Sequence, residues 1–279
     1  MIRHFCFILM ILTCLTASAK KHKQLVILHT NDTHSTVLPI SATLPDTMKA
    51  GRGGFIRRLA MLKEERAKHP DLLYFDSGDF CQGSAYYSMF KGDVEIGLMN
   101  KMGIEASTIG NHEFDDGLEN MARIFKMANF PILCTNYDFT GTVMEGICKP
   151  WIIIKRNGVK IGVFAVCPKL EGLVSKKNCV GVKYLDPAKV ALETATMLKE
   201  EKKCDMVICI SHLGWESYRA EDDLVMIRGS RNIDLVLGGH SHTYMKTLQY
   251  EKNMDGKPVP VDQNGKHAIY VGKIVVNLE

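Results

Sequence analysis

Short apolar runs and amphipathic stretches alternate along the chain from residue 24 onward. The short runs predict buried strands, because they have strand length and end at polar or glycine-rich segments. The longer stretches repeat their apolar residues every three or four positions, which predicts helices with one buried face. The predicted strands are 25–29, 72–75, 106–109, 131–135, 206–211 and 235–237, and the predicted helices are 54–68, 94–102, 117–128 and 187–203.

Local signals define two of these regions more closely. Asp186 is a suitable N-cap for a helix with Pro187 at its first position, where proline is favoured. Residues 151–167 predict a hairpin, because Asn157-Gly158 is a strong two-residue turn signal. Residues 258–278 predict further short strands. The alternation of strands and helices predicts one α/β domain over residues 20–279, with a mixed sheet or two sheets.

The first nineteen residues have the pattern of an export signal. A basic start at Arg3 precedes an apolar run at 5–15, and Ala17-Ser18-Ala19 is a small-residue cleavage site. This pattern predicts cleavage after Ala19 and a secreted or periplasmic protein. A retained anchor helix and lipid attachment at Cys14 are the alternatives. No later segment is long and apolar enough to predict a stable membrane span after cleavage.

Composition changes this picture little. The chain is 46% hydrophobic and 24% charged, as ordinary globular proteins are. Its net charge of +4 and its lack of a long basic tract give no reason to expect a nucleic-acid partner. Nine cysteines include two in the export signal, and the odd remainder contains no C-x-x-C pair. We expect mostly buried free thiols, with a Cys148–Cys179 bridge as the alternative.

Potential metal ligands follow five of the predicted strands, in T-N-D-T-H, D-S-G-D, G-N-H-E-F-D, S-H-L-G and G-G-H-S-H. Ligands of α/β sheets bind where strands end, so these segments are expected to meet. Carboxylate and imidazole groups suit divalent cations. There are too many donors for one tetrahedral site, which predicts two adjacent metals that share a carboxylate. The donors are Asp32, His34, Asp79, Asn111, His212, His240 and His242.

The order of these motifs resembles that of the calcineurin-like metallophosphoesterases. Their finer forms, LHTNDTHS, DSGD, GNHEFD, SHLG and GGHSHT, are similar to those of the secreted 5′-nucleotidase and UDP-sugar hydrolase branch. The motifs span residues 28–243, most of the mature chain. The resemblance implies a four-layer α/β/β/α sandwich with two mixed β-sheets.

The resemblance also implies a role for each donor. Asp32, His34 and His242 would bind the first metal, Asn111, His212 and His240 the second, and Asp79 would bridge both. The ligand set accepts Zn, Mn, Co or Fe, so the sequence does not choose among them.

Two further side chains would complete the catalytic site. His112 would point at the phosphate, and Asp115 would accept a hydrogen bond from the His112 ring, with an N-cap role for the next helix as its alternative. Asn111, His112 and Asn136 are the candidate substrate contacts, and Asn136 is equally compatible with a turn residue. Glu113 is expected to be solvated or to support a ligand. Asp76 is expected to support the ligands, for example by orienting a histidine.

This site predicts hydrolysis of phosphate esters. Two metals ~3.5–4 Å apart can share a water, lower its pKa and so supply a bridging hydroxide for in-line attack. The expected substrates are 5′-nucleoside monophosphates, and a phosphodiester, a UDP-sugar or a sulfur ester is the alternative. Secreted 5′-nucleotidases usually carry a second, nucleotide-binding domain, and we expect this chain to consist of the catalytic domain without it. The chain is therefore also compatible with the catalytic half of a two-chain assembly that is inactive alone.

Overall fold

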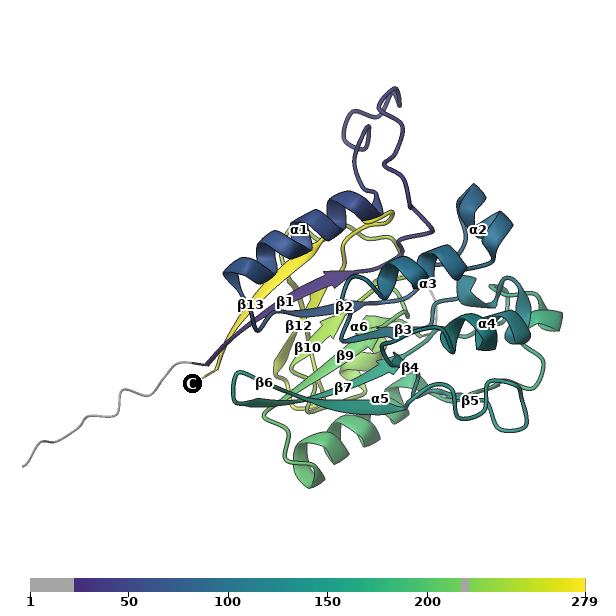
Figure 1. Cartoon of the computed structure of the whole chain (residues 1–279). Coiled ribbons are helices and arrows are strands. Elements are labelled where there is room, and N and C mark those ends of the chain that lie inside the picture. The colour runs from purple at the N-terminus through teal and green to yellow at the C-terminus, as the bar shows by residue number, and fades with distance from the viewer. Residues whose placement is uncertain (1–22, 217–220, 279) are drawn as a thin grey trace, which may run out of the picture.

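Two β-sheets lie face to face in the computed structural model, which describes residues 23–216 and 221–278 (Figure 1). The predicted export signal lies outside these residues. Within them, no helix is both long and apolar enough to cross a bilayer. The first strand, β1 (Lys23–Thr30), pairs with the last, β13 (Gly272–Leu278), so both ends of the described chain lie side by side.

The first sheet has five strands in the order β13-β1-β2-β3-β4. Strands β1 to β4 run parallel, and β13 is antiparallel to β1 at one edge. The carboxyl ends of β1, β2 and β3 therefore open at the same edge of the sheet. The strands not yet given are β2 (Leu73–Asp76), β3 (Ala106–Thr108) and β4 (Ile132–Leu133).

The second sheet has six strands in the order β11-β12-β10-β9-β7-β6. Its four inner strands are parallel, and β6 and β11 run antiparallel at the two edges. The predicted hairpin at Asn157-Gly158 is confirmed, since it joins β6 to β7. The strands are β6 (Trp151–Arg156), β7 (Val159–Val166), β9 (Met206–Ser211), β10 (Leu235–Leu237), β11 (Gln249–Lys252) and β12 (Pro258–Asp262).

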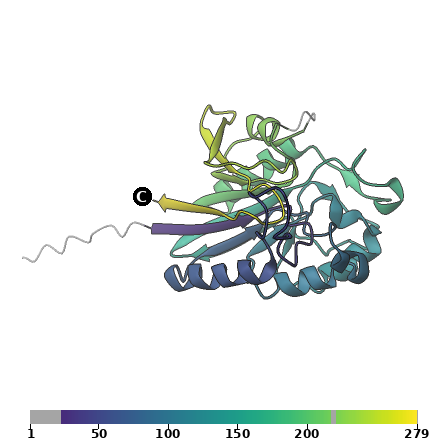
Figure 2. The same ribbon diagram turned by 90° about the horizontal axis from the view of Figure 1, so that it is seen from above.

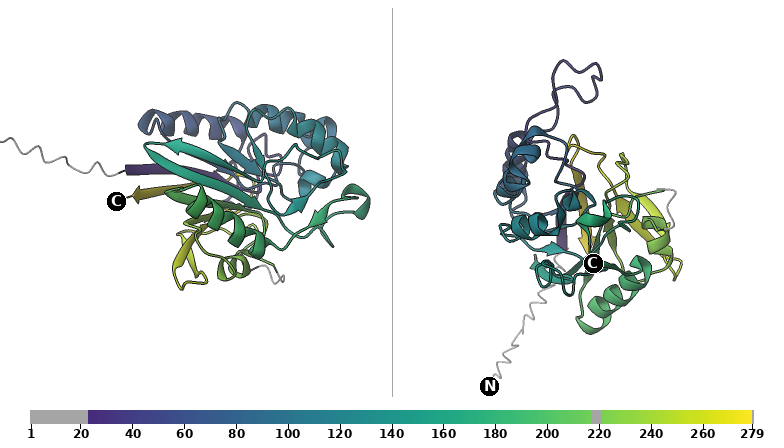
Figure 3. Two further views of the ribbon diagram at one scale, coloured as in Figure 1. Left: turned by 90° about the horizontal axis from the view of Figure 1, so that it is seen from below. Right: turned by 90° about the vertical axis from the view of Figure 1, so that its right-hand side faces the viewer.

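Helices cover the outer face of each sheet, and views from above and below show them on opposite sides of the molecule (Figures 2 and 3). Helices α1 to α4 pack on the first sheet, and α5 and α6 pack on the second. The cap predicted at Asp186 is confirmed, because its side chain accepts the backbone N–H groups of Ala188 and Lys189. The helices are α1 (Phe55–Lys68), α2 (Ala85–Phe90), α3 (Asp93–Met99), α4 (Gly117–Phe125), α5 (Pro187–Thr196) and α6 (Asp223–Arg228).

Small elements complete the chain. A two-stranded ribbon joins β5 (Tyr137–Asp138) to β8 (Lys183–Tyr184). Short helical turns lie at His112–Phe114, Lys176–Asn178 and, with π geometry, Met197–Glu201.

Three apolar layers hold the sheets and helices together. Alternate side chains of a strand face opposite sides, so Leu25 and Ile27 of β1 enter the layer between the sheets, while Val26 and Leu28 pack under α1 to α4. In the same way, Ile208 of β9 faces the first sheet. These layers confirm the predicted four-layer α/β/β/α sandwich with two mixed sheets.

Candidate metal and catalytic site

The predicted ligands meet where the two sheets present the carboxyl ends of their strands. Asp32 follows β1, Asp79 follows β2 and Asn111 follows β3, whereas the three histidines of the second sheet follow β9 and β10. Ligand atoms lie within 4.8 Å of one another in three overlapping groups, so the residues form one cluster that spans both sheets. The groups are Asp32, His34 and His242; His34, Asp79 and His112; and Asp79, His212 and His240.

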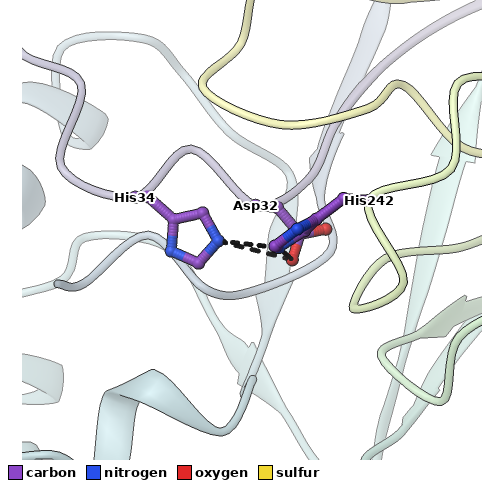
Figure 4. Close-up of side chains that lie close together, drawn as sticks. All are labelled: Asp32, His34 and His242. Atoms are coloured by element: carbon purple, nitrogen blue, oxygen red, sulfur yellow. Dashed lines mark hydrogen bonds and ion pairs between the residues drawn. The ribbon is translucent and has the colours of Figure 1, made fainter. Parts of the chain in front are cut away.

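In the first group, His34 and His242 point toward the carboxylate of Asp32 (Figure 4). Their Nε2 atoms lie 3.0 Å apart, and Asp32 Oδ1 lies 3.3 Å from His242 Nε2 and 3.8 Å from His34 Nε2. Asp32 is fully buried. His242 is 35% exposed, so the group opens to solvent on the side of that histidine.

In the third group, His212 is oriented by a backbone contact on the side away from Asp79. Its Nδ1 donates to the carbonyl oxygen of Ser77, which turns Nε2 toward Asp79 Oδ2 at 3.2 Å. Burial lowers the pKa of His212, but the carboxylates of Asp79 and Asp32 and the hydrogen bond to Ser77 together outweigh burial and raise this pKa to about 10. Conversely, burial raises the pKa of Asp79, and His212, His112 and His34 together outweigh burial and hold that pKa well below its usual range.

Buried polar atoms in this cluster lack hydrogen-bond partners among the described residues. They include Asn111 Oδ1, and also Asp32 Oδ1 and His212 Nε2, which make ion-pair contacts such as those with His242 and Asp79 described above. An unpaired buried polar atom is costly, so such atoms need a partner from outside the chain. Carboxylate, amide and imidazole donors are the types that divalent metals accept, and the residues therefore fit the predicted metals.

The backbone at the cluster is strained. Five of the seven predicted ligands have positive φ, in the left-handed region that side chains other than glycine rarely adopt. Such a conformation costs of the order of 1–3 kcal/mol per residue and is concentrated at functional sites. The angles are 48° at Asp32, 42° at His34, 53° at Asp79, 72° at His240 and 55° at His242.

His112 lies at the rim of the cluster, with its ring centroid 5.3 Å from that of His34. The predicted hydrogen bond is present, since His112 Nδ1 lies 2.9 Å from Asp115 Oδ2. Burial lowers the pKa of His112, but this bond and the charge of Asp79 outweigh burial and raise it. The alternative for Asp115 is wrong, because Asp116 is the N-cap residue of α4.

Glu113 is completely buried rather than solvated. Its carboxylate accepts the backbone N–H groups of Asp79, Cys81 and Gly110, at 3.0, 3.0 and 2.6 Å. Burial, together with the negative charge of Asp79, raises the pKa of Glu113 to about 7. Glu113 thus joins the ends of β2 and β3 beneath two of the predicted ligands, which fits the supporting role expected as its alternative.

Asp76 supports the site through strands instead of through a histidine. Its carboxylate accepts from Thr30 Oγ1 at 2.7 Å and Ser107 Oγ at 3.3 Å, and so connects β1, β2 and β3. Among the described residues, Asp76 makes no hydrogen bond to a ligand histidine, so the idea that it orients one is wrong. The backbone of the next residue, Ser77, performs that task for His212.

Asn136 does not join the cluster through its side chain. Its amide donates to the Cys167 carbonyl and accepts from the Cys167 N–H, each at 2.8 Å, and the residue is fully buried. The alternative, a structural role at a turn, accounts for both ends of the amide. The seven cysteines of the described residues are free thiols, and they include Cys148 and Cys179.

His267 is a neighbour of the cluster that sequence reasoning missed. Its ring centroid lies 5.8 Å from that of His34, and its Nδ1 lies 3.0 Å from Thr36 Oγ1. In the sequence it is one histidine among polar residues and follows none of the predicted strands. Only the return of the chain past Asp32, where His267 N donates to Asp32 O at 2.7 Å, brings it to the site.

Comparisons with known proteins agree on one family. The family model described as calcineurin-like phosphoesterase matches residues 25–244. The chain is 31% identical over 274 residues to snake venom 5′-nucleotidase from Gloydius brevicauda, an alignment that covers 91% of this chain and 45% of that protein. The chain thus spans less than half the length of this curated relative.

Solved structures give the same result. The 5′-nucleotidase precursor from Thermus thermophilus superimposes with a TM-score of 0.83 at 27% identity, over 92% of this chain and 52% of that one. The calcineurin-like phosphoesterase YfkN from Bacillus subtilis gives 0.76 at 26% identity, over 92% and 86% of the two chains.

Proposed function

Since the chain belongs to the calcineurin-like phosphoesterase family, we propose that it hydrolyses phosphate esters with two divalent metal ions, and 5′-nucleoside monophosphates before other esters. The nucleotide preference is supported by the similarity to 5′-nucleotidases. The export pattern at residues 1–19 supports a protein that acts outside the cytoplasm.

The observation that carries the proposal is the shared position of Asp79. It belongs to two of the ligand groups, one with His34 and His112 and one with His212 and His240, so its carboxylate lies within reach of ligands of both proposed metals. Asp32, His34 and His242 would hold one ion, and Asn111, His212 and His240 the other. When bound, such ions lower the pKa of a water and neutralise charge on the phosphoryl oxygens.

The chain's own residues orient the substrate and move the proton. His112 is 31% exposed and stands at the open side of the cluster, where a phosphate can reach it. Asp115 holds the Nδ1 proton of His112, which leaves Nε2 to donate to a phosphoryl oxygen or to the departing alkoxide. Asn111 would contact the same phosphate group as well as the metal.

The test is phosphate release from 5′-AMP by protein that is stripped with chelator and then supplied with Mn²⁺ or Zn²⁺. We expect activity only with metal, and a loss of roughly 10²–10⁴-fold in His112→Ala, the usual contribution of general acid–base catalysis. His69→Ala, at the end of α1, is the matched control and keeps full activity. Release that is equally fast after chelation, or unchanged in His112→Ala, would disprove the mechanism.

A further inference from the structure

A cleft of about 520 Å³ opens directly beside the metal cluster. His34 belongs both to the predicted ligands and to the wall of the cleft. The rest of the wall comes from the loop after β1, which projects from the body of the molecule (Figure 3), from the start of α2, and from Lys266 and His267. A phosphate held at the cluster therefore has this concavity next to it.

The lining of the cleft is apolar and aromatic, with positive charge. Val37, Ile40 and Leu44 supply aliphatic surface, and the half-buried Tyr86 supplies a ring. Lys49 and Lys266 also line the cleft, and among the described residues no carboxylate does. Pockets of this size, with few polar groups on an apolar wall, are typical sites for small molecules. Lys49 is already paired with Asp46 at 2.8 Å, so it is Lys266 that favours a molecule with negative charge.

The wall nearest the metals is fixed by tight backbone contacts. A Cβ atom at Gly53 would lie 2.9 Å from the carbonyl oxygen of His267, and one at Gly83 would lie 2.8 Å from that of His34. His267 itself has φ of 64° and is held through Nδ1 by Thr36. Backbone strain of this kind persists only where the surroundings hold it, so this end of the cleft is a built feature.

We propose that this cleft binds the leaving group of the ester, and that it takes a planar aromatic group such as a nucleobase against Tyr86. This inference rests on the proposed function and gives this chain a base-binding surface of its own. The phosphate would lie at His34 and the cluster, and the attached organic group would extend along the apolar wall. An aromatic side chain stacks on any base, so the site would select aromatic leaving groups without reading one base.

The experiment compares kcat/KM for 5′-AMP with kcat/KM for glycerol phosphate, whose leaving group has no ring. We expect Tyr86→Ala to lower the ratio of the two values roughly tenfold, mainly through a higher KM for AMP. Tyr86→Phe keeps the ring and should keep the ratio. Tyr250→Ala, at an exposed tyrosine of β11, is the matched control. A ratio unchanged in Tyr86→Ala would overturn the inference.

Failure of the proposed function would show differently, because the wild-type chain would hydrolyse neither ester. Equilibrium dialysis with adenosine, which has no phosphate, then tests whether the cleft binds a nucleobase. Binding to the wild type that weakens roughly tenfold in Tyr86→Ala would support the cleft without the reaction. Equal binding to both proteins, or no binding, would overturn it.

Discussion

Glu113 lies between the ends of β2 and β3 with no exposed surface and accepts three backbone N–H groups. One of these N–H groups belongs to Asp79, a predicted ligand, and another belongs to Gly110, which precedes the predicted ligand Asn111. Gly110 also makes room for Asp79, because a Cβ atom there would collide with Asp79 Oδ1. Single residues that touch neither metal nor phosphate thus determine where the central carboxylate stands.

We expect Glu113→Gln to lower the free energy of unfolding by about 1–3 kcal/mol, because an amide nitrogen would face a backbone N–H and leave it unpaired. Urea unfolding of the chelator-treated protein measures this loss without a contribution from metal. Glu119→Gln, on the exposed face of α4, should change stability little. Equal stability of the two variants would show that Glu113 is not a required acceptor.

At this scale the sequence predicted which residues meet but not how each is supported. Side chains at strand ends can be identified from the motif order, and the His112–Asp115 pair follows from a spacing of three residues. Gly78 allows a sharp turn after β2, with φ of 81°. Gly239 instead makes room, since a Cβ there would lie 2.9 Å from His212 Nδ1. Such a contact depends on both sheets being in place.

Among the elements, the short helix α6 carries an unusual acid behind the site. Asp223 is buried in its first turn and accepts from Ser211, the residue before His212. Burial raises the pKa of Asp223 to about 7, and the charge of Asp222 adds to the effect. Below about pH 7 the folded protein therefore favours the uncharged acid at this position.

This raised pKa predicts a pH dependence of stability. The unfolded chain has a pKa of about 3.9 at this side chain, so between pH 4 and 7 the folded state binds more protons. The free energy of unfolding should fall across this window, by up to about 4 kcal/mol, and stay low above pH 7. Asp223→Asn removes this dependence, so its stability relative to wild type should rise from pH 5 to pH 8.

Urea unfolding at the two pH values, with chelator present, measures that difference. Asp71→Asn, at an exposed aspartate, is the control whose difference from wild type should not vary with pH. A constant difference for Asp223→Asn as well would show that Asp223 is ionised in the folded protein at pH 5.

The sequence predicted the long helices and the buried strands, but it missed two short helices and an edge strand. Helices α2 and α6 have six residues each, too few for a helical repeat of apolar positions to stand out. A local signal for α2 was present nonetheless, because Ser84 caps it by accepting from Tyr86 N and Tyr87 N. Strand β11 lies at a sheet edge with mostly exposed residues, so it lacks the apolar pattern of a buried strand.

For the whole molecule, the ligand cluster is a connection between the two sheets. Asp32 and Asp79 come from the first sheet, and His212 and His242 come from the second. A cation bound to both would bind the folded chain and not the unfolded one, and so would stabilise the packing of the sheets. The alternation of strands and helices in the sequence allowed either one mixed sheet or two sheets. The motif resemblance predicted two.

We expect the melting temperature to rise by roughly 10 °C when metal is supplied at 1,000 times its dissociation constant, since this excess stabilises by about 4 kcal/mol and each kcal/mol is worth about 2–4 °C. Differential scanning calorimetry with and without chelator measures the shift. Asp79→Asn should lose most of it, whereas Asp255→Asn, at an exposed residue, should keep it. A shift of the same size in both variants would place the stabilising metal elsewhere.

The distance along the chain between the ligands also determines when metal can be acquired. His34 and His242 are 208 residues apart, so a growing chain holds no complete site until nearly all of it has been synthesised and folded. A chain that crosses a membrane unfolded would arrive without its metals and take them up on the far side. The ions found in the mature protein would then reflect the supply in the compartment where it folds, and not the supply in the compartment where it was made.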